Sequence, residues 1–346
     1  MQLAGVEIGV GRKPFVVAEI SGNHCQSTET AIELIEGAWE AGASAVKLQT
    51  FLPQLMTLDV DRPAFYANPE GPWKGQKLID VYRRSVLPFE AQREVYRHCA
   101  SRGILVFSAP FDEPSVEFLE TVQNPIYKIA SFELVHLPLI RKVAATGKPV
   151  IMSTGMATTI EIAEAVETAR SSGVKDLVLL KCTSSYPAPP AESNLAAIPK
   201  MRALFDCEVG LSDHTLGIGA ALAAVALGAT VIEKHVTLSR AAGGVDASFS
   251  LELDEFARLV VEAGRAAESI GDATIGPTDA ETSGRARRRS LYVVSEVRKG
   301  ESFDPANVAV IRPGLGLAPK YYDDVLRRRA ARDLSAGTPL SWEDCA

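Results

Sequence analysis

The chain has 346 residues and a formal net charge of −7 at pH 7, with 47% hydrophobic and 23% charged residues. The acidic balance argues against a large nucleic-acid footprint, and no apolar run reaches the ~20 residues that a membrane-spanning helix needs. The five cysteines are scattered without a CxxC pair, which indicates a reducing compartment and no thiolate metal site. With no secretory signal pattern at the N-terminus, the sequence favours a cytoplasmic protein that binds neither nucleic acid nor membrane.

Eight short segments rich in apolar and β-branched residues recur along the chain, and each is a candidate strand. Most of the gaps between them run about 20 to 30 residues, the length of a loop and a crossover helix. Glycines near the ends of the intervening helical patterns fit left-handed helix caps. The eight candidates are residues 15–21, 45–51, 104–111, 126–134, 149–156, 177–187, 208–215 and 230–238.

Eight such units predict a closed (β/α)8 barrel over residues 1–271. A doubly wound open sheet is the alternative, but the Gly-rich turn expected after its first strand is missing. Residues 52–76, rich in Pro, Gly and aromatic side chains, predict a long active-site loop on the barrel rim. Residues 272–289 are polar and predict a linker, and residues 290–346 predict a separate small domain with short strands.

Each candidate strand begins with apolar residues and ends with polar ones. In a barrel of parallel strands the carboxyl ends converge on one rim, where such enzymes react. The stretch VIEKHVTLS shows the pattern, because an apolar start leads into Glu233, Lys234 and His235. Alternation along a strand predicts that Glu233 and His235 share one face and that Lys234 lies on the other.

Two of the five histidines, His214 and His235, end consecutive candidate strands. Neighbouring strands lie about 4.8 Å apart, so both imidazoles can share one metal ion and leave positions open for substrate oxygens. A pair of hydrogen-bonded rim histidines is the alternative. Glu233 is a candidate third ligand or a group that orients a histidine, and His24 is a further candidate at a strand end.

Three lysines lie inside otherwise apolar strands, where a buried ammonium needs an anion or a carboxylate. They are Lys47, Lys128 and Lys181. Together with nearby serines they are candidates for holding a phosphate or a carboxylate. Two alternatives are a Schiff-base lysine of the aldolase type, at Lys128 or Lys181, and structural salt bridges.

The ordered set of motifs resembles the sialic acid synthase family, which condenses phosphoenolpyruvate with an amino sugar. In the family's order, the motifs are VAEISGNH, AVKLQTF, SAPF, YKIAS, IMSTGMAT, KCTSSYPAP, VGLSDHT and VIEKHVTLSR. RRRSLYVV and AVIRPGLGL, which follow them, resemble the family's antifreeze-like (SAF) domain. The resemblance covers nearly the whole chain and implies a TIM barrel followed by a small, mostly β SAF domain.

The resemblance also implies roles for individual residues. His214 and His235 would bind a divalent ion, Mn²⁺ first with Mg²⁺ or Co²⁺ as alternatives, and Glu19 would join them in catalysis. Phosphoenolpyruvate would be held by Lys47, Ser108, Lys128, Ser131, Ser153, Ser184 and Ser212. The sugar would contact Gln49, Tyr186 and Asp246, together with Arg312 of the partner subunit in a homodimer with exchanged SAF domains.

Within the family, AEISGNH, PWKGQKLIDVYRRSVLPFE and TLSRAAGGVDASFSL look more like the branch that makes pseudaminic acid. Its acceptor is 2,4-diacetamido-2,4,6-trideoxy-L-altrose, which needs a partly apolar pocket; the aromatics of residues 52–76 and Phe249 are candidates for it. Branches that use N-acetylmannosamine or the legionaminic acid precursor remain alternatives. A Schiff-base aldolase and a non-catalytic carbohydrate-binding protein are alternatives from other classes.

Overall fold

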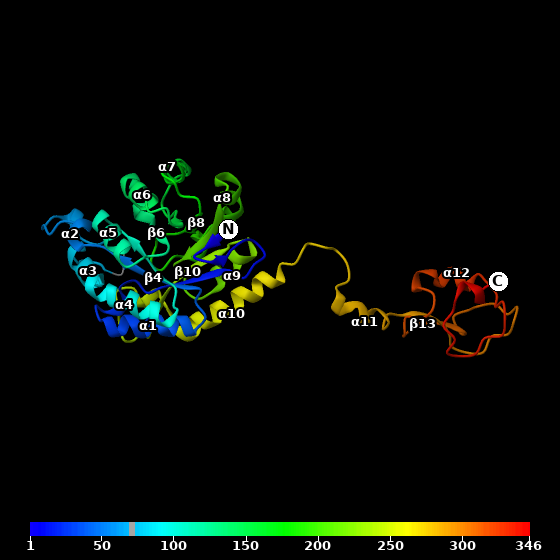
Figure 1. The fold of residues 1–346 in the computed structure, drawn as a ribbon. Coiled ribbons are helices and arrows are strands. Elements are labelled where there is room, and N and C mark those ends of the chain that lie inside the picture. The colour runs from blue at the N-terminus through cyan, green and yellow to red at the C-terminus, as the bar shows by residue number, and fades with distance from the viewer. Residues whose placement is uncertain (69–72) are drawn as a thin grey trace. The chain divides into compact units, whose positions relative to one another are not determined.

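The computed structural model describes residues 1–68 and 73–346, and the chain divides into two compact units. The first unit comprises Met1–Gly271 and the second Asp272–Ala346. In Figure 1 the first unit is a ring of strands surrounded by helices, drawn from blue to yellow, and the second unit is drawn in orange and red.

A closed barrel of parallel strands forms the first unit, as the sequence predicts. Each strand pairs with the next along the chain, and β10 pairs with both β9 and β3, which closes the sheet. A two-residue strand, β11 (Leu251–Glu252), lies beside β10. The barrel strands are β3 (Phe15–Glu19), β4 (Ala45–Thr50), β5 (Val106–Pro110), β6 (Tyr127–Ile129), β7 (Val150–Ser153), β8 (Leu177–Cys182), β9 (Glu208–Asp213) and β10 (Val231–Thr237).

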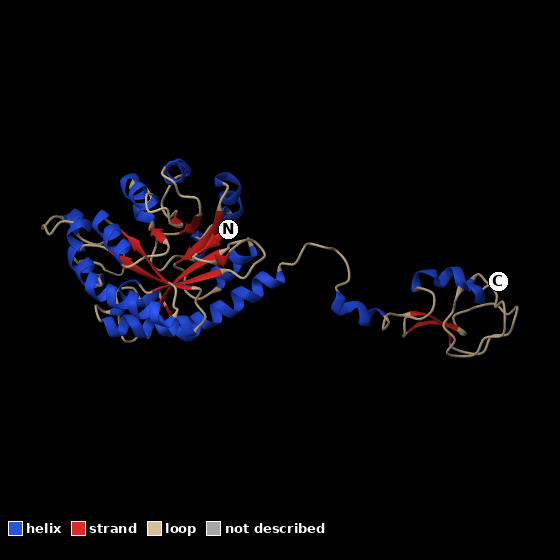
Figure 2. Ribbon diagram, in the orientation of Figure 1, coloured by secondary structure: helices blue, strands red, loops and turns tan. Residues whose placement is uncertain are grey.

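Helices cover the outside of the barrel (Figure 2). Their ends follow local chemistry: the Ser27 side chain caps the first of them by accepting from Thr30 N–H, and Gly103, at φ +69°, ends the α4 helix in the left-handed conformation. The helices are α1 (Thr28–Glu40), α4 (Phe89–Arg102), α5 (Glu113–Thr121), α6 (Leu137–Ala144), α7 (Thr159–Ser171), α8 (Ala197–Phe205), α9 (Gly219–Ala226) and α10 (Leu253–Ser269).

Two apolar layers show which face each strand residue occupies. An interior cluster fills the barrel with, among others, Val17, Ala45, Ile151 and Val231. A larger cluster lies between the strands and the helices and takes the alternate positions, such as Val46. An N-terminal hairpin, β1 (Gln2–Leu3) and β2 (Val6–Glu7), adds Leu3 and Ile8 to the interior cluster. Polar residues at the carboxyl ends of the strands can therefore be assigned to one face by counting along each strand.

The loop predicted at residues 52–76 carries two short helical pieces, α2 (Pro53–Met56) and η2 (Pro63–Phe65), and leads into α3 (Leu78–Ser85). Residues 69–72 of this loop lie outside the described residues. The indole N–H of Trp73 donates to the carbonyl oxygen of Val245 at 3.1 Å. The loop is thereby attached to the segment that follows β10, at the rim where the strands end.

Short 3-10 turns follow several of the strands. They are η1 (Ser21–His24), η3 (Ser131–Glu133), η4 (Pro190–Glu192) and η5 (Ala247–Phe249). No helix among the described residues is long and apolar enough to cross a membrane.

The second unit has a small core of its own around Leu291, Val293, Val308 and Leu340. Its two regular strands, β12 (Ser290–Val293) and β13 (Val308–Ile311), pair antiparallel, and isolated bridges such as Val297 with Leu334 extend the pairing. The remaining pieces are η6 (Asp279–Glu281), α11 (Thr282–Arg285), η7 (Pro319–Tyr321), α12 (Tyr322–Leu326) and η8 (Trp342–Asp344). The segment predicted as a linker, 272–289, is exposed but carries η6 and α11.

Candidate active site

The carboxyl ends of the strands place a set of polar side chains on the interior face of the barrel. Most lie two or four residues after an interior apolar residue, as Glu19 follows Val17 and Lys47 follows Ala45, and Ser212 is the register partner of Glu233. The alternation predicted for β10 is confirmed, because Glu233 follows interior Val231. The predicted residues on this face are Glu19, Lys47, Gln49, Lys128, Ser153, Ser212, Glu233 and His235.

Two lysines and two glutamates form a buried, alternating charge cluster on this face. Lys47 Nζ lies 2.5 Å from Glu19 Oε2 and 3.7 Å from Glu233 Oε1, and Lys128 Nζ lies 3.7 Å from the same Glu233 oxygen. All four residues are nearly inaccessible to solvent. Glu233 Oε2 has no hydrogen-bond partner among the described residues. Because a buried carboxylate oxygen without a partner is costly, the cluster leaves a place for a polar ligand.

The pKa shifts of the cluster residues indicate which of them can carry a proton. Burial raises the pKa of Glu19 above its ordinary value, even though Lys47 opposes the shift. Burial also acts to raise the pKa of Glu233, but Lys128 and Lys47 outweigh it and hold that pKa low. Burial lowers the pKa of Lys128, with Glu233 acting against it. Glu19 is therefore the carboxyl of the cluster best suited to carry a proton.

Four serine hydroxyl groups lie at neighbouring strand ends, and two of them contact the charge cluster directly. Lys128 Nζ donates to Ser153 Oγ at 2.7 Å, and Ser212 Oγ donates to Glu233 Oε1 at 3.2 Å. Ser131 Oγ accepts the backbone N–H of Gly155, and a Cβ atom at Gly155 would overlap the hydroxyls of both Ser131 and Ser184. Ammonium, hydroxyl and backbone groups thus converge as in sites for phosphate or carboxylate.

Ser108 does not belong to this set, and the expectation for it has to be corrected. Its neighbour Phe107 lies in the interior cluster, so the Ser108 side chain lies on the helix side of β5. There its hydroxyl is 2.6 Å from Thr50 Oγ1, which in turn donates to Gln92 of α4. A shift of one residue along a strand moves a side chain to the other face, and Ala109, paired with Gln49, occupies the position that faces the site.

Lys181 likewise lies outside the site. It pairs in register with Leu211, a residue of the layer between strands and helices. Its ammonium donates to the carbonyl oxygen of Cys182 at 2.8 Å and to Thr183 Oγ1 at 3.3 Å. Of the two lysines considered for a Schiff base, only Lys128 faces the interior.

His214 and His235 stand side by side at the ends of β9 and β10, with ring centroids 5.3 Å apart. His214 Nδ1 donates to the carbonyl oxygen of Thr183 at 3.0 Å, so Nε2 is the ring nitrogen left for a ligand. Burial acts to lower the pKa of His214, but the neighbouring Cys182 outweighs it and raises that pKa. His235 Nδ1 is buried without a partner among the described residues. Burial lowers the pKa of His235 well below its ordinary value, so its ring is neutral, the form that binds metals.

This histidine pair fits a divalent metal ion held by two imidazoles. Among residues 1–68 and 73–346, no group of three or more His, Cys, Asp or Glu side chains has the geometry to hold a metal. An ion held by two imidazoles alone would leave its remaining coordination positions to substrate oxygens or water. An open coordination sphere of this kind is typical of catalytic rather than structural ions.

A second polar network leads away from Glu19 toward the rim. Gln49 Nε2 donates to Glu19 Oε1 at 2.9 Å and to Ser21 Oγ at 3.0 Å, and Ser21 Oγ donates to the buried carboxylate of Asp246. The Asp246 backbone N–H in turn donates to Asn23 Oδ1 at 3.1 Å. These donors and acceptors, continuous with Glu19, suit the hydroxyl and amide groups of a sugar.

Aromatic rings form the apolar side of the same region. Tyr186 lies 4.3 Å from His214 between ring centroids and 5.3 Å from Phe249, and Phe249 lies 5.2 Å from His235. Trp73 of the long loop lies 6.2 Å from Tyr186. Of the aromatic residues expected to line a partly apolar pocket, Phe249 therefore lies beside the histidine pair, and Trp73 of the 52–76 loop reaches the same group through Tyr186.

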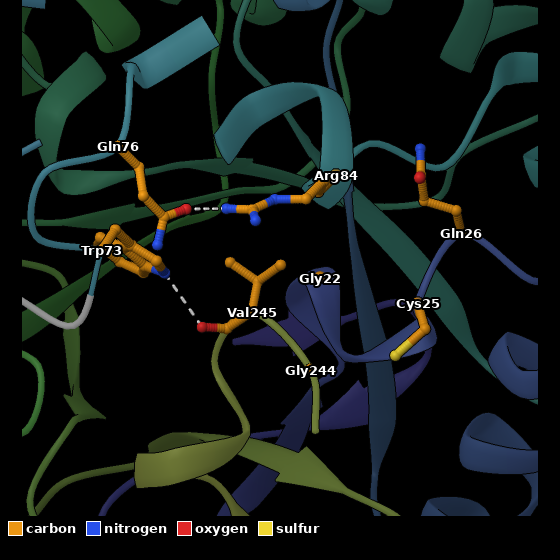
Figure 3. Close-up of a pocket in the computed structure, with 8 residues that line it drawn as sticks. All are labelled: Gly22, Cys25, Gln26, Trp73, Gln76, Arg84, Gly244 and Val245. Carbon is orange, nitrogen blue, oxygen red and sulfur yellow. Dashed lines mark hydrogen bonds between the residues drawn. The ribbon is translucent and has the colours of Figure 1, made fainter. Parts of the chain in front are cut away.

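A cavity of about 460 Å³ opens beside this region at the rim (Figure 3). Figure 3 shows Trp73 and Gln76 on one side of it, Arg84 hydrogen-bonded to Gln76, and Val245 between them and the η1 turn. The remaining lining residues are Gly22, Cys25, Gln26 and Gly244. Gly22 and Val245 are the chain neighbours of Ser21 and Asp246, so the cavity adjoins the polar network just described.

The sequence interpretation missed Glu133, which ends the η3 turn after β6. Its Oε2 atom is buried without a hydrogen-bond partner among the described residues, although the residue is half-buried as a whole. Burial raises the pKa of Glu133 to about 7, with the backbone and Lys128 opposing the shift. The signal was a polar residue after an apolar strand in KIASFEL, the same signal that identified Ser131.

His24 and Arg312 are two further residues that the sequence singles out as functional candidates. His24 Nδ1 accepts the backbone N–H of Gln26, and burial lowers the His24 pKa to about 4, which is the pattern of a structural neutral histidine. Arg312 is exposed in the turn after β13 of the second unit. Its role in a partner subunit stays a prediction.

Fold and site together define a TIM-barrel enzyme with a buried lysine–glutamate cluster and a paired-histidine centre at the carboxyl ends of its strands. Residues 34–274 match the NeuB family, and residues 288–346 match the SAF domain. The chain belongs to the NeuB family and carries a SAF domain at its C-terminal end.

Characterised relatives cover nearly the full chain. The pseudaminic acid synthase of Campylobacter jejuni subsp. jejuni serotype O:2 is 40% identical over 96% of this chain and 97% of its own length. The N,N'-diacetyllegionaminic acid synthase of the same organism is 35% identical over 93% of this chain and 97% of its own. This chain is thus similar to synthases of two acidic sugars, with the higher identity to the pseudaminic acid enzyme.

Solved structures show the same architecture. The N-acetylneuraminic acid synthetase of Leptospira borgpetersenii serovar Hardjo-bovis, crystallised with citrate, matches with a TM-score of 0.73 at 30% identity. The match covers 82% of this chain and 94% of that one. The TIM barrel predicted from the sequence is therefore found in a solved relative.

Proposed function

We propose that this protein condenses phosphoenolpyruvate with 2,4-diacetamido-2,4,6-trideoxy-L-altrose to give pseudaminic acid and phosphate. The observation that carries the proposal is its likeness to pseudaminic acid synthases over 96% of the chain. The lower identity to a diacetyllegionaminic acid synthase supports the altrose derivative over the alternative acceptors. The site geometry supports the reaction class, because cationic, paired-histidine and sugar-compatible regions adjoin one another.

Phosphoenolpyruvate binds at the lysine cluster in this proposal. Lys128 and Lys47 supply positive charge, and Ser131, Ser153, Ser184 and Ser212 supply hydroxyls at neighbouring strand ends. The anion enters a cluster in which Glu19 and Glu233 already balance both lysines. Binding of the anion therefore favours uptake of a proton by Glu19, whose pKa is already raised by burial.

The open-chain sugar binds between the histidine pair and the rim. Gln49 and Asp246 bind its hydroxyl and amide groups, while Tyr186, Phe249 and Trp73 cover its apolar parts. A divalent ion, Mn²⁺ with Mg²⁺ or Co²⁺ as alternatives, held by His214 and His235, would supply Lewis-acid polarisation of the sugar's aldehyde oxygen. His214 is oriented for this by its contact with the Thr183 carbonyl oxygen.

The condensation forms one C–C bond and breaks the C2–O bond of phosphoenolpyruvate. C3 of phosphoenolpyruvate forms a bond to the aldehyde carbon, whose oxygen takes a proton and becomes a hydroxyl. Water adds to C2 and loses one proton; the C2 hydroxyl then passes its remaining proton to the departing phosphate as the C2–O bond breaks and the C2 ketone forms. Glu19 and Glu133, with raised pKa values, are the carboxyls that can give and take these protons. Positioning by the lysines and serines contributes most of the rate.

The proposal includes a homodimer with exchanged SAF domains. Arg312 of the partner subunit would then complete the sugar end of each site, which gives the small domain a role in catalysis. The exposed position of the arginine, in the turn after β13, supports a contact made outside its own unit.

Phosphate release from phosphoenolpyruvate in the presence of Mn²⁺ tests the proposed function. The three acceptors are the altrose derivative, N-acetylmannosamine and the legionaminic acid precursor, offered in parallel. We expect release with the altrose derivative and at most slow release with the others. Preferential release with N-acetylmannosamine or the legionaminic precursor would replace the proposed acceptor, and no release with any sugar would contradict the reaction class.

A further inference from the structure

The two strand ends that carry His214 and His235 are joined, on the opposite face of the sheet, by a buried ion pair. Lys234 Nζ lies 2.8 Å from Asp213 Oδ2, and the two side chains are 1% and 2% exposed. Lys234 and Asp213 are register partners across β10 and β9 and are the immediate chain neighbours of the two histidines. Because side chains alternate along a strand, the ion pair faces the helices while His235 faces the interior.

The same ammonium group holds the chain on both sides of His214. Lys234 Nζ also donates to the carbonyl oxygen of Thr215, and the Thr215 N–H donates to Asp213 Oδ1 at 2.9 Å. The backbone of residues 213–215 is thereby bracketed between the carboxylate and the ammonium. These contacts fix where β9 ends relative to β10, and with it the position of one imidazole relative to the other.

The surroundings of the pair argue that stability alone does not explain it. The neighbouring positions on this face, Leu211, Ile232 and Val236, belong to the apolar layer under the helices. A buried ion pair in such a layer contributes little net stability, because desolvation offsets the attraction, and apolar side chains of similar volume often do as well. What an apolar replacement cannot supply is the set of directional contacts to residues 213–215.

We propose that Lys234 and Asp213 are positioning residues that set the separation of His214 and His235 and thereby the affinity of the site for a divalent metal ion. The inference rests on the metal site of the proposed function. Residues that orient the groups ligating a metal typically contribute about 10- to 100-fold to its affinity. Neither residue touches the substrates in this arrangement, so the effect is exerted through the two histidines.

Binding of Mn²⁺ by the full-length protein, without substrates, tests this directly, with the electron paramagnetic resonance signal of free Mn²⁺ as the readout. The double variant Asp213→Leu/Lys234→Met replaces the pair with apolar side chains, and we expect it to keep its thermal transition. We expect its Kd for Mn²⁺ to rise at least about tenfold. Asp213→Asn, which keeps an acceptor for the Thr215 N–H, is a milder second variant with an effect in the same direction.

The matched control is Glu208→Gln at the other end of β9, where Glu208 pairs with Arg202 at 3.5 Å, far along the strand from the histidines. Its Kd should equal that of the wild type. An unchanged Kd in a folded double variant, or in Asp213→Asn, would overturn the proposal. Absence of Mn²⁺ binding by the wild type would contradict the metal site itself, whereas normal Mn²⁺ binding without phosphate release would contradict only the proposed function.

Discussion

The imidazole rings of His214 and His235 lie 5.3 Å apart between centroids, at the ends of neighbouring strands, and both are buried. In the proposed mechanism they are the protein's two metal ligands. Excess EDTA should therefore abolish phosphate release, and Mn²⁺ should restore it. His214→Ala and His235→Ala should each lower kcat by roughly 10²-fold or more, since each removes half of the protein's ligands.

His98→Ala is the control for these variants, because His98 pairs with Glu36 away from the site, at 3.1 Å. We expect wild-type kcat from it. Full activity of the wild-type enzyme in excess EDTA would contradict the metal-dependent mechanism.

Ser153 and Ser108 lie on opposite faces of the barrel wall and should respond differently to removal of their hydroxyls. Ser153→Ala leaves Lys128 without its hydroxyl partner and should raise the KM for phosphoenolpyruvate by roughly tenfold, because a hydrogen bond to a charged group contributes about 1.5–3 kcal/mol. Ser108→Ala should leave that KM unchanged and lower Tm by a few degrees, since it removes one of the two hydrogen-bond partners of the buried Thr50 hydroxyl. Steady-state kinetics and thermal melting check the pair, and a raised KM for Ser108→Ala would contradict the assignment of faces.

Glu133 should make the stability of the protein depend on pH. Its pKa is about 7 in the folded chain and near 4.5 when unfolded, so between these values the folded state holds more protons. The free energy of unfolding therefore falls as pH rises from about 4.5 to about 7. Glu133→Gln should remove this loss. At pH 8 its free energy of unfolding should exceed that of the wild type by about 1–2 kcal/mol, a figure reduced for the partial exposure of Glu133. At pH 4.5 the two proteins should be equally stable.

Thermal melting of the wild type and Glu133→Gln at both pH values provides the measurement. Glu164→Gln, on the exposed face of α7, is the control and should match the wild type at each pH. A stability difference for Glu133→Gln that is the same at pH 4.5 and pH 8 would rule out the raised pKa.

Exchange of SAF domains predicts complementation between two inactive variants. In a mixed dimer of Arg312→Ala and His235→Ala chains, one site combines an intact barrel with Arg312 of the partner subunit, and the other site carries both substitutions. Random reassociation of an equal mixture should recover about a quarter of wild-type activity. If the arginine instead serves its own barrel, mixing will recover no activity; if it serves none, Arg312→Ala will already be active alone, which would also contradict the exchange.

Sequence alone predicted the barrel because each strand is a compact apolar segment and the spacing between segments is regular. It also placed Glu233 and His235 on one face, since alternation is a local property of a strand. Ser108 was assigned to the site because it is the polar residue at the end of its strand and because the family resemblance implies that role. Only the pairing of β5 with β4 shows that Ala109, not Ser108, faces the interior.

Contacts between distant segments were beyond sequence reasoning. The attachment of Trp73 to Val245 joins residues 172 positions apart, and no local pattern encodes it. Lys128 and Lys181 look alike as lysines within apolar strands. Lys128 faces the Glu233 carboxylate and the Ser153 hydroxyl, whereas Lys181 faces backbone carbonyl and hydroxyl oxygens outside the barrel. Glu133 was missed because its importance comes from burial, which a single polar letter after a strand does not reveal.

The fate of the bridging oxygen of phosphoenolpyruvate tests the central claim most directly. The protein is incubated with Mn²⁺, the altrose derivative and phosphoenolpyruvate labelled with ¹⁸O between C2 and phosphorus, and both products are analysed by mass spectrometry. The account predicts that pseudaminic acid forms and that all of the bridging label leaves in phosphate, because the C2–O bond breaks. Label retained at C2 of the sugar acid, or phosphate formed without a condensed sugar product, would contradict it.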